Sequence, residues 1–265
     1  MTVHSPFIEV TNVDVSYPIG RFVRGSIKAN LFRLVGVKER GQRQSGFVRS
    51  LRDVNFRIET GERVGIIGAN GAGKTTLLRA IAGVYPTSRG TIRVRGSIQS
   101  LFEISLGFEA EATGRENILY RGLIMGCTPQ LIREREAAIV EFADIDEFID
   151  LPVRMYSAGM AVRLAFAIST ILDGDILLID EVFGVGDMAF QIKATKRLND
   201  LIDKAHIVIL VGHDLGTIEK LSSRVLWLDH GRLIADGPAA EVIANYRSSV
   251  NNAEAVKMAK TMPAT

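Results

Sequence analysis

Apolar and polar residues alternate in two stretches near the N-terminus, which is the pattern of β-strands with one buried face. The first stretch covers residues 7–17, and the second covers residues 54–58 and ends at a Thr-Gly-Glu turn. We expect these stretches to form antiparallel strands that lead into the segment after the turn.

Three uninterrupted apolar runs lie further along the chain, at residues 64–67, 176–179 and 207–211. Short apolar runs without alternation are typical of strands that are buried on both faces of a parallel sheet. The runs therefore predict a parallel sheet behind the antiparallel strands.

A helical pattern separates the first two apolar runs. Apolar residues recur at helical spacing from Arg115 to about Asp150, and Thr128 and Pro129 are suited to cap and begin one of these helices. The whole pattern predicts an α/β fold with a mainly parallel sheet, an antiparallel N-terminal β subdomain and an inserted helical lobe.

The segment after the first apolar run fits the phosphate-loop pattern GxxxxGK[ST] between a strand and a helix. Its glycines let backbone N–H groups turn toward phosphate oxygens, and the helix start adds the positive end of its dipole. Lys74 is suited to reach the β- and γ-phosphates, and the Thr75 hydroxyl is suited to bind Mg²⁺. We expect a nucleoside triphosphate to be bound by nine residues: Gly68, Ala69, Asn70, Gly71, Ala72, Gly73, Lys74, Thr75 and Thr76.

Acidic and histidine side chains follow the other two apolar runs, Asp180 and Glu181 after one and His213 after the other. Ligands of open parallel sheets bind beyond the carboxyl ends of the strands, so we expect these side chains beside the phosphate loop. There, Asp180 can hold Mg²⁺, Glu181 can orient or deprotonate an attacking water, and His213 can sense the γ-phosphate. The alternatives are an acidic pair that only caps a helix or turn and a histidine with a structural role.

Ser157, Ala158 and Gly159 come just before another helical stretch. Serine is a good N-cap, and a glycine near a helix start leaves backbone N–H groups accessible to an anion. From these residues alone, the segment is either a second anion site or an ordinary capped helix.

Composition narrows the classes of protein that fit. The 265 residues are 47% hydrophobic, enough for a full core, and no segment reaches the roughly 18 uncharged apolar residues of a membrane span. A formal net charge of +2 argues against a dedicated nucleic-acid binder, and the single Cys127 suits the cytoplasm. We also expect no secretory signal, because the N-terminus lacks its charged and apolar regions.

Taken in order, the phosphate loop, Ser157 to Gly159, Asp180-Glu181, Asp187 and His213 resemble the ATP-binding subunit of an ABC transporter. Residues 113–117, 156–167 and 180–187 resemble in particular the subfamily that exports O-antigen, capsular polysaccharide or teichoic acid. The resemblance implies that Ser157 and Gly159 belong to the signature motif, which contacts the γ-phosphate of ATP bound to the opposite subunit. It also implies that Asp187 lies in the D-loop and that His213 is the switch histidine.

Some positions depart from the family pattern or match it loosely. The signature differs from the general LSGGQ form, and Ala158 is unexpected even beside the YSSGM-like form that is usual in the subfamily. No glutamine lies at the expected distance before Asn117, so Glu103 is the nearest candidate for the Q-loop role at Mg²⁺, while Gln99 lies too early. Tyr17 fits the aromatic residue that stacks on adenine, or it is an ordinary aromatic at a strand end.

The resemblance implies an ABC ATPase domain over residues 1–247, with the helical lobe at about 104–165. We expect residues 248–265 to be a short polar tail, because a carbohydrate-binding β-sandwich such as some O-antigen exporters carry needs about 100 residues. The expected assembly is a homodimer of ATPase subunits under two copies of a separate transmembrane permease, on the cytoplasmic face of the inner membrane. Its cofactors would be ATP and Mg²⁺, and its cargo would be lipid-linked polysaccharide. We expect no nucleic-acid partner.

Other functions remain as alternatives. The chain fits an ABC subunit for another transported substrate, including an importer subunit. A soluble ABC protein of DNA repair or translation usually has a long coiled-coil insertion or two tandem ATPase domains, and neither fits this chain. A small-molecule phosphotransferase would leave Ser157, Glu181 and His213 unexplained.

Residues 21–49 form a basic insertion with eight basic side chains against one acidic residue, Glu39, a net charge of +7. Apolar residues recur at helical spacing between Val23 and Val35, so part of the insertion is expected to be a basic amphipathic helix. Such a helix either faces a membrane surface or an anionic lipid headgroup, or packs on the domain with its polar face in solvent.

Overall fold

The computed structural model describes residues 5–19, 46–102, 108–180 and 187–261. Glu103, Glu181 and residues 20–45 of the basic insertion therefore lie outside the described residues. Residues 46–49, at the end of the predicted insertion, belong to a β-strand.

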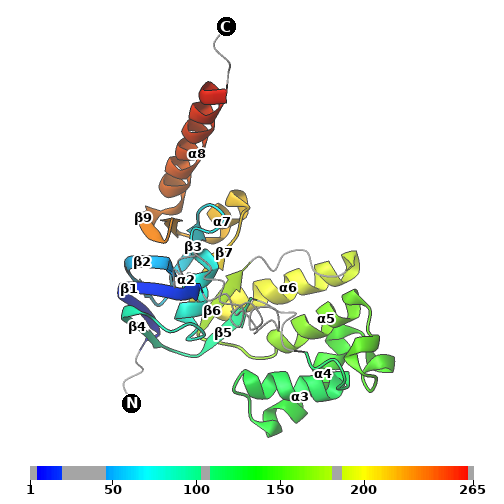
Figure 1. The fold of residues 1–265 in the computed structure, drawn as a ribbon. Coiled ribbons are helices and arrows are strands. Elements are labelled where there is room, and N and C mark those ends of the chain that lie inside the picture. The colour runs from blue at the N-terminus through cyan, green and yellow to red at the C-terminus, as the bar shows by residue number, and fades with distance from the viewer. Residues whose placement is uncertain (1–4, 20–45, 103–107, 181–186, 262–265) are drawn as a thin grey trace, which may run out of the picture.

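Two sheets form the centre of the molecule (Figure 1). The smaller sheet is antiparallel and has the strand order β2-β1-β4. Its strands are β1 (Phe7–Ile19), β2 (Gly46–Glu59) and β4 (Arg89–Arg95). This sheet is the predicted N-terminal β subdomain.

The larger sheet has the order β5-β6-β7-β3-β8-β9 and is parallel except for its last pair, β8 and β9. Its strands are β3 (Arg63–Ile67), β5 (Ile98–Leu101), β6 (Ile176–Asp180), β7 (Ile207–Val211), β8 (Arg224–Asp229) and β9 (Arg232–Pro238). The three uninterrupted apolar runs form β3, β6 and β7, which occupy the middle of this sheet. The mainly parallel sheet predicted from the sequence is thereby confirmed.

The core lies on both faces of the larger sheet. Helix α2 (Lys74–Ile81) places its buried Leu77 and Leu78 in one cluster with apolar residues of both sheets. On the other face, the sheet packs against α6 (Met188–Lys204) and the buried Val242 and Ile243 of α8 (Ala239–Thr261). Because helices cover both faces, the middle strands need no polar side.

The predicted helical lobe comprises α3 (Gly114–Ile124), α4 (Pro129–Ala143) and α5 (Ala158–Ser169), which lie together at one end of the molecule (Figure 1). The lobe has its own buried cluster, to which all three helices contribute. Thr128 caps α4 by accepting from the backbone N–H of Leu131, and Pro129 is its first residue, as predicted.

Helix α8 starts on the body of the molecule and extends away from it (Figure 1). Near its start, Tyr246 packs edge-to-face on Trp227 with ring centroids 5.4 Å apart. Residues 248–261, which we predicted as part of a polar tail, continue this helix. Among the described residues, no helix is both long and apolar enough to cross a bilayer.

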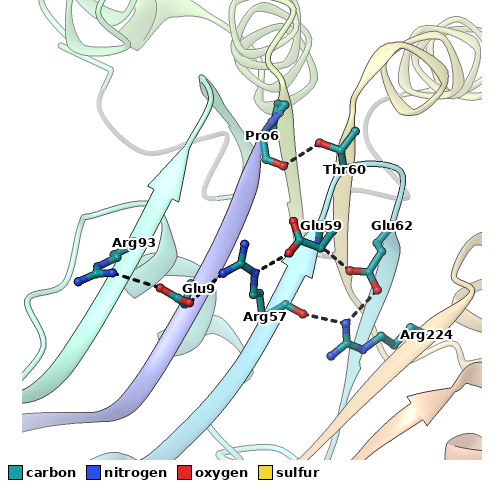
Figure 2. Close-up of polar contacts among 8 residues, drawn as sticks. All are labelled: Pro6, Glu9, Arg57, Glu59, Thr60, Glu62, Arg93 and Arg224. Atoms are coloured by element: carbon teal, nitrogen blue, oxygen red, sulfur yellow. Dashed lines mark hydrogen bonds and ion pairs between the residues drawn. The ribbon is translucent and has the colours of Figure 1, made fainter. Parts of the chain in front are cut away.

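Hydrogen bonds and ion pairs of Arg224 join the two sheets, and Figure 2 shows those to Arg57 and Glu62. Arg224 of β8 donates to the Arg57 carbonyl of β2 at 2.8 Å and to the Glu62 carboxylate at 2.9 Å. It also donates twice to Asp236 of β9, at 2.6 and 2.7 Å. The Asp236 carboxylate, followed by Glu62, raises the pKa of the Arg224 guanidinium. One side chain thus links β2, β8 and β9 near the strand that leads into the phosphate loop.

Candidate functional site

The phosphate loop leaves the end of β3, and α2 begins at Lys74. Gly73 is the N-cap residue and adopts a left-handed conformation, with φ of 107°. A Cβ at this position would also lie 2.8 Å from the Ser50 carbonyl oxygen. Glycine is therefore required both by the turn and by the close approach of β2.

Lys74 holds the loop from inside. Its side chain is buried, and its Nζ donates to the carbonyls of Gly68 at 2.8 Å and Ala69 at 3.1 Å. The ammonium is thus fixed in the concavity of the loop, where it can neutralise a phosphate.

Thr75 and Asp180 meet where α2 begins and β6 ends. The Thr75 hydroxyl donates to an Asp180 carboxylate oxygen over 2.9 Å. A hydroxyl and a carboxylate at this spacing supply the hard oxygen ligands that Mg²⁺ prefers. These two residues therefore fit the magnesium role predicted for them.

The strand ends enclose one pocket of about 400 Å³. His213, exposed beyond the end of β7, faces the same pocket as the loop and Asp180. The lining residues are Ser50, Asn70, Gly71, Ala72, Gly73, Lys74, Thr75, Thr76, Asp180, Val211 and His213. The structure thus brings together seven of the nine predicted loop residues with Asp180 and His213, while Gly68 and Ala69 are not among the lining residues.

Two contacts of the phosphate loop with other elements were not predicted from the sequence. The Ser50 hydroxyl of β2 lies 2.9 Å from the Thr76 hydroxyl. Gly231, in the turn between β8 and β9, donates its N–H to the Ala72 carbonyl at 2.9 Å and accepts from the Arg52 N–H at 2.7 Å. No local sequence pattern indicates that Ser50 contacts the loop, and Gly231 in the sequence predicts only the turn of a hairpin.

The predicted second anion site lies elsewhere in the chain. Ser157 caps α5 by accepting from the Met160 N–H at 3.2 Å, and Ser157, Ala158 and Gly159 are all exposed. None of the three lines the pocket. A Cβ at Gly159 would meet only the Ser157 hydroxyl, at 3.9 Å. The chain's own packing therefore gives no reason for this glycine.

Asp187 is the N-cap of α6 and accepts from the Phe190 N–H at 2.9 Å. That hydrogen bond lowers the pKa of the Asp187 carboxyl. Asp187 is not among the pocket residues, and within the described part of the chain it is the cap of α6.

Tyr17 lies beside the pocket and does not line it. Its ring packs edge-to-face on Tyr85 with centroids 5.1 Å apart. Its hydroxyl is buried close to Thr76, with no hydrogen-bond partner among the described residues. Burial raises the pKa of this phenol. Stacking on adenine stays a prediction for Tyr17.

Gln99 is buried and donates to the Ser169 carbonyl at 3.1 Å, which is a structural role. The Q-loop role assigned to Glu103 and the water-activating role assigned to Glu181 stay predictions.

The chain resembles known proteins over most of its length. The model of the ABC transporter family matches residues 51–184, which include the phosphate loop and Asp180. The chain is 42% identical over 250 residues to an O-antigen export system ATP-binding protein of Myxococcus xanthus, and it covers 56% of that relative and 92% of itself. It is also 42% identical to an O-antigen export system ATP-binding protein of Yersinia enterocolitica, over 83% of this chain and 93% of the relative.

A solved structure of a dimeric ATP-binding cassette in a post-hydrolysis state, bound to ADP and Pi, has a TM-score of 0.63. It is 19% identical over 88% of this chain and 98% of the other, and it supports the fold alone. The matched family model and the relatives together show that the chain belongs to the ABC transporter family, among sequences similar to the ATP-binding subunits of O-antigen exporters.

Proposed function

We propose that this chain is the ATP-hydrolysing subunit of an exporter that moves lipid-linked cell-surface polysaccharide, such as O-antigen or capsule, across the inner membrane. The observation that carries the proposal is one pocket that contains the Lys74 ammonium, the Thr75–Asp180 pair and His213. The similarity to O-antigen export proteins supports the choice of cargo.

The residues of the pocket divide the work of binding and hydrolysis. Backbone N–H groups of the loop and Lys74 hold the β- and γ-phosphates, while Thr75 and Asp180 would hold Mg²⁺. When bound, the metal ion neutralises charge on the phosphate oxygens. Glu181 accepts a proton from the attacking water while the oxygen of that water bonds to the γ-phosphorus. The bond between the γ-phosphorus and the oxygen that bridges to the β-phosphate breaks. His213, at the pocket edge, contacts the departing phosphate.

A second copy of the chain completes the site in this proposal. Ser157 and Gly159 lie exposed at the start of α5, outside the chain's own pocket, and the space around Gly159 is open. A helix start with accessible N–H groups suits the γ-phosphate of ATP held by another subunit. Closure of two subunits around two ATP molecules is then the step that drives a permease.

The remaining parts of the assembly follow from this role. Two ATPase subunits would bind two copies of a transmembrane permease from the cytoplasmic face of the inner membrane. Deletion of the gene should then leave lipid-linked polysaccharide inside the cell and remove it from the surface. A normal amount of surface polysaccharide after deletion would contradict the proposed cargo but not the proposed ATPase activity.

The purified protein tests the mechanism through Glu181→Gln. We expect this variant to bind ATP, to hydrolyse it at least about 100-fold more slowly, and to accumulate as an ATP-dependent dimer. Phosphate release gives the rate, and light scattering after gel filtration gives the mass. Glu241→Gln, in the exposed first turn of α8, is the matched control and should behave as wild type. A Glu181→Gln monomer with normal turnover is incompatible with the proposal.

A further inference from the structure

The segment before α3 runs alongside the segment that leads to Ser157. The Val153 N–H donates to the Ala112 carbonyl at 2.9 Å, and the Arg154 N–H donates to the Ala110 carbonyl at 3.0 Å. A bridge between Thr113 and Pro152 continues this pairing. We call residues 109–117 the α3 strap, because they hold residues 149–156 by backbone hydrogen bonds.

The α3 strap is itself rigidly fixed. Asn117 is completely buried, and its amide donates to the carbonyls of Glu109, Ala112 and Thr113 while its oxygen accepts from the Glu109 N–H. Thr113 and Glu116 form a reciprocal capping box, so α3 starts at a defined residue. Buried, fully paired polar groups of this kind specify one arrangement of the backbone.

The strap reaches the next segment through side chains as well. Arg115 donates to Asp150 through two nitrogens, at 2.8 and 3.1 Å, and also pairs with Glu136 of α4. Its backbone N–H donates to the Ile149 carbonyl at 3.1 Å. Both the backbone and the guanidinium of Arg115 therefore fix the segment about seven residues before Ser157.

Gly114 and Tyr156 form the contact nearest to α5. The Tyr156 hydroxyl donates to the Phe148 carbonyl at 2.8 Å, and its oxygen would lie only 2.2 Å from a Cβ at Gly114. Tyr156 directly precedes Ser157, the cap of α5. A Cβ at Gly114 would also lie 2.9 Å from Cδ1 of Ile149 and 3.1 Å from its carbonyl oxygen. A side chain at Gly114 would therefore displace the Tyr156 ring and the Ile149 segment, and with them the start of α5.

We propose that the α3 strap positions the Ser157–Gly159 motif for its contact with the second subunit, with Gly114 and Tyr156 as the positioning residues. This rests on the proposed function, in which that motif completes the partner's ATP site. The residues that line the pocket include none of the strap, so we expect its effect on the closed dimer and not on nucleotide binding by one chain.

The test uses Gly114→Ala in the Glu181→Gln protein. ATP affinity, measured with a fluorescent ATP analogue at protein concentrations below dimerisation, should stay within about twofold of the parent. The protein concentration needed for the ATP-dependent dimer should rise by about tenfold or more, which corresponds to roughly 1.4 kcal/mol. Adding Tyr156→Phe removes the closest clashing atom and leaves the contacts with Ile149, so the double variant should recover part of the dimerisation.

Gly122→Ala is the matched control on the same helix. Its Cβ would lie 2.7 Å from two atoms of Ile132 on α4, so it disturbs lobe packing without touching Tyr156. Dimerisation of this variant should match the parent. The inference is overturned if Gly114→Ala dimerises normally, if Gly122→Ala impairs dimerisation equally, or if Tyr156→Phe gives no recovery. A parent protein that binds ATP without dimerising would instead contradict the proposed function.

Discussion

Lys74 both holds the phosphate loop in its conformation and supplies a positive charge inside it. It is buried and donates to the Gly68 and Ala69 carbonyls, so the ammonium is already in place before a phosphate arrives. Hydrogen bonds of charged groups contribute about 1.5–3 kcal/mol each, and we expect Lys74→Ala to lower ATP affinity by roughly 10- to 100-fold. Titration calorimetry measures this loss. Lys196→Ala, exposed on α6, should keep full affinity, and unchanged binding by Lys74→Ala would contradict the role.

Asp14 makes the stability of the fold depend on pH. Its buried carboxylate accepts from the Asp53 N–H at 2.8 Å and pairs with Arg49, and these contacts lower the pKa of Asp14 from 3.8. A carboxyl with a lowered folded pKa stabilises the protein above the unfolded pKa, and this stabilisation disappears as pH falls through the folded pKa.

Asp14→Asn should therefore be less stable than wild type at pH 7, and the difference should vanish as the pH falls below the folded pKa of Asp14. Urea unfolding of both proteins from pH 7 down to about pH 2 measures this difference. Asp53→Asn, at an exposed neighbouring position, is the control. An Asp14→Asn deficit that stays constant with pH would refute the assignment.

At the scale of elements, the sequence predicted the strands and strand-end residues that follow from a local pattern of residues. Uninterrupted apolar runs identified β3, β6 and β7, and the strand-end rule placed Asp180 and His213 beside the loop, because parallel strands share one carboxyl edge. Ser50 could not be predicted this way, since it reaches the loop from an antiparallel strand of another sheet.

Residues 113–117 show the same limit. In the sequence they served only as a mark of resemblance, yet the structure gives Thr113, Gly114, Arg115 and Asn117 specific contacts. The partners of Gly114 and Arg115 lie some 20 to 40 positions away, and no periodic signal links such distant residues. Tertiary pairing therefore decides the role of this motif.

The Arg224 network is the element-scale feature that we expect to matter most for stability. Arg224 is three-quarters buried and donates to Asp236 of β9. It also donates to the Arg57 carbonyl of β2 and to Glu62 (Figure 2). Its removal leaves carboxylates without their partner, so Arg224→Ala should lower the free energy of unfolding by about 1–3 kcal/mol. Chemical denaturation measures the change.

Arg63→Ala is the comparison for Arg224→Ala. Arg63 forms an ion pair with Asp203 at 3.1 Å, and both side chains are well exposed. Its loss should cost at most about 0.5 kcal/mol. Equal effects of the two substitutions would show that the network does not tie the sheets together.

At the scale of the whole molecule, the groups that our proposal places around ATP lie in two places. The phosphate-binding groups gather at the carboxyl edge of the larger sheet, whereas the exposed Ser157 and Gly159 belong to the helical lobe. A protein organised in this way binds ATP as one chain and, in our proposal, needs a second chain to hydrolyse it. Affinity and turnover are therefore expected to respond to different substitutions.

Gly159→Asp separates these two requirements. Gly159 is the second residue of α5, where an added carboxylate meets no clash and gains about 0.3–1 kcal/mol from the helix dipole, so the single chain should fold at least as well as wild type. The same negative charge would face the γ-phosphate held by the second subunit and repel it. We expect unchanged ATP affinity of the monomer, no ATP-dependent dimer and loss of hydrolysis. Gln130→Asp introduces a carboxylate at the second position of α4, in the same lobe, and should leave all three measurements unchanged. A Gly159→Asp protein that dimerises and hydrolyses ATP like wild type would place the γ-phosphate contact elsewhere.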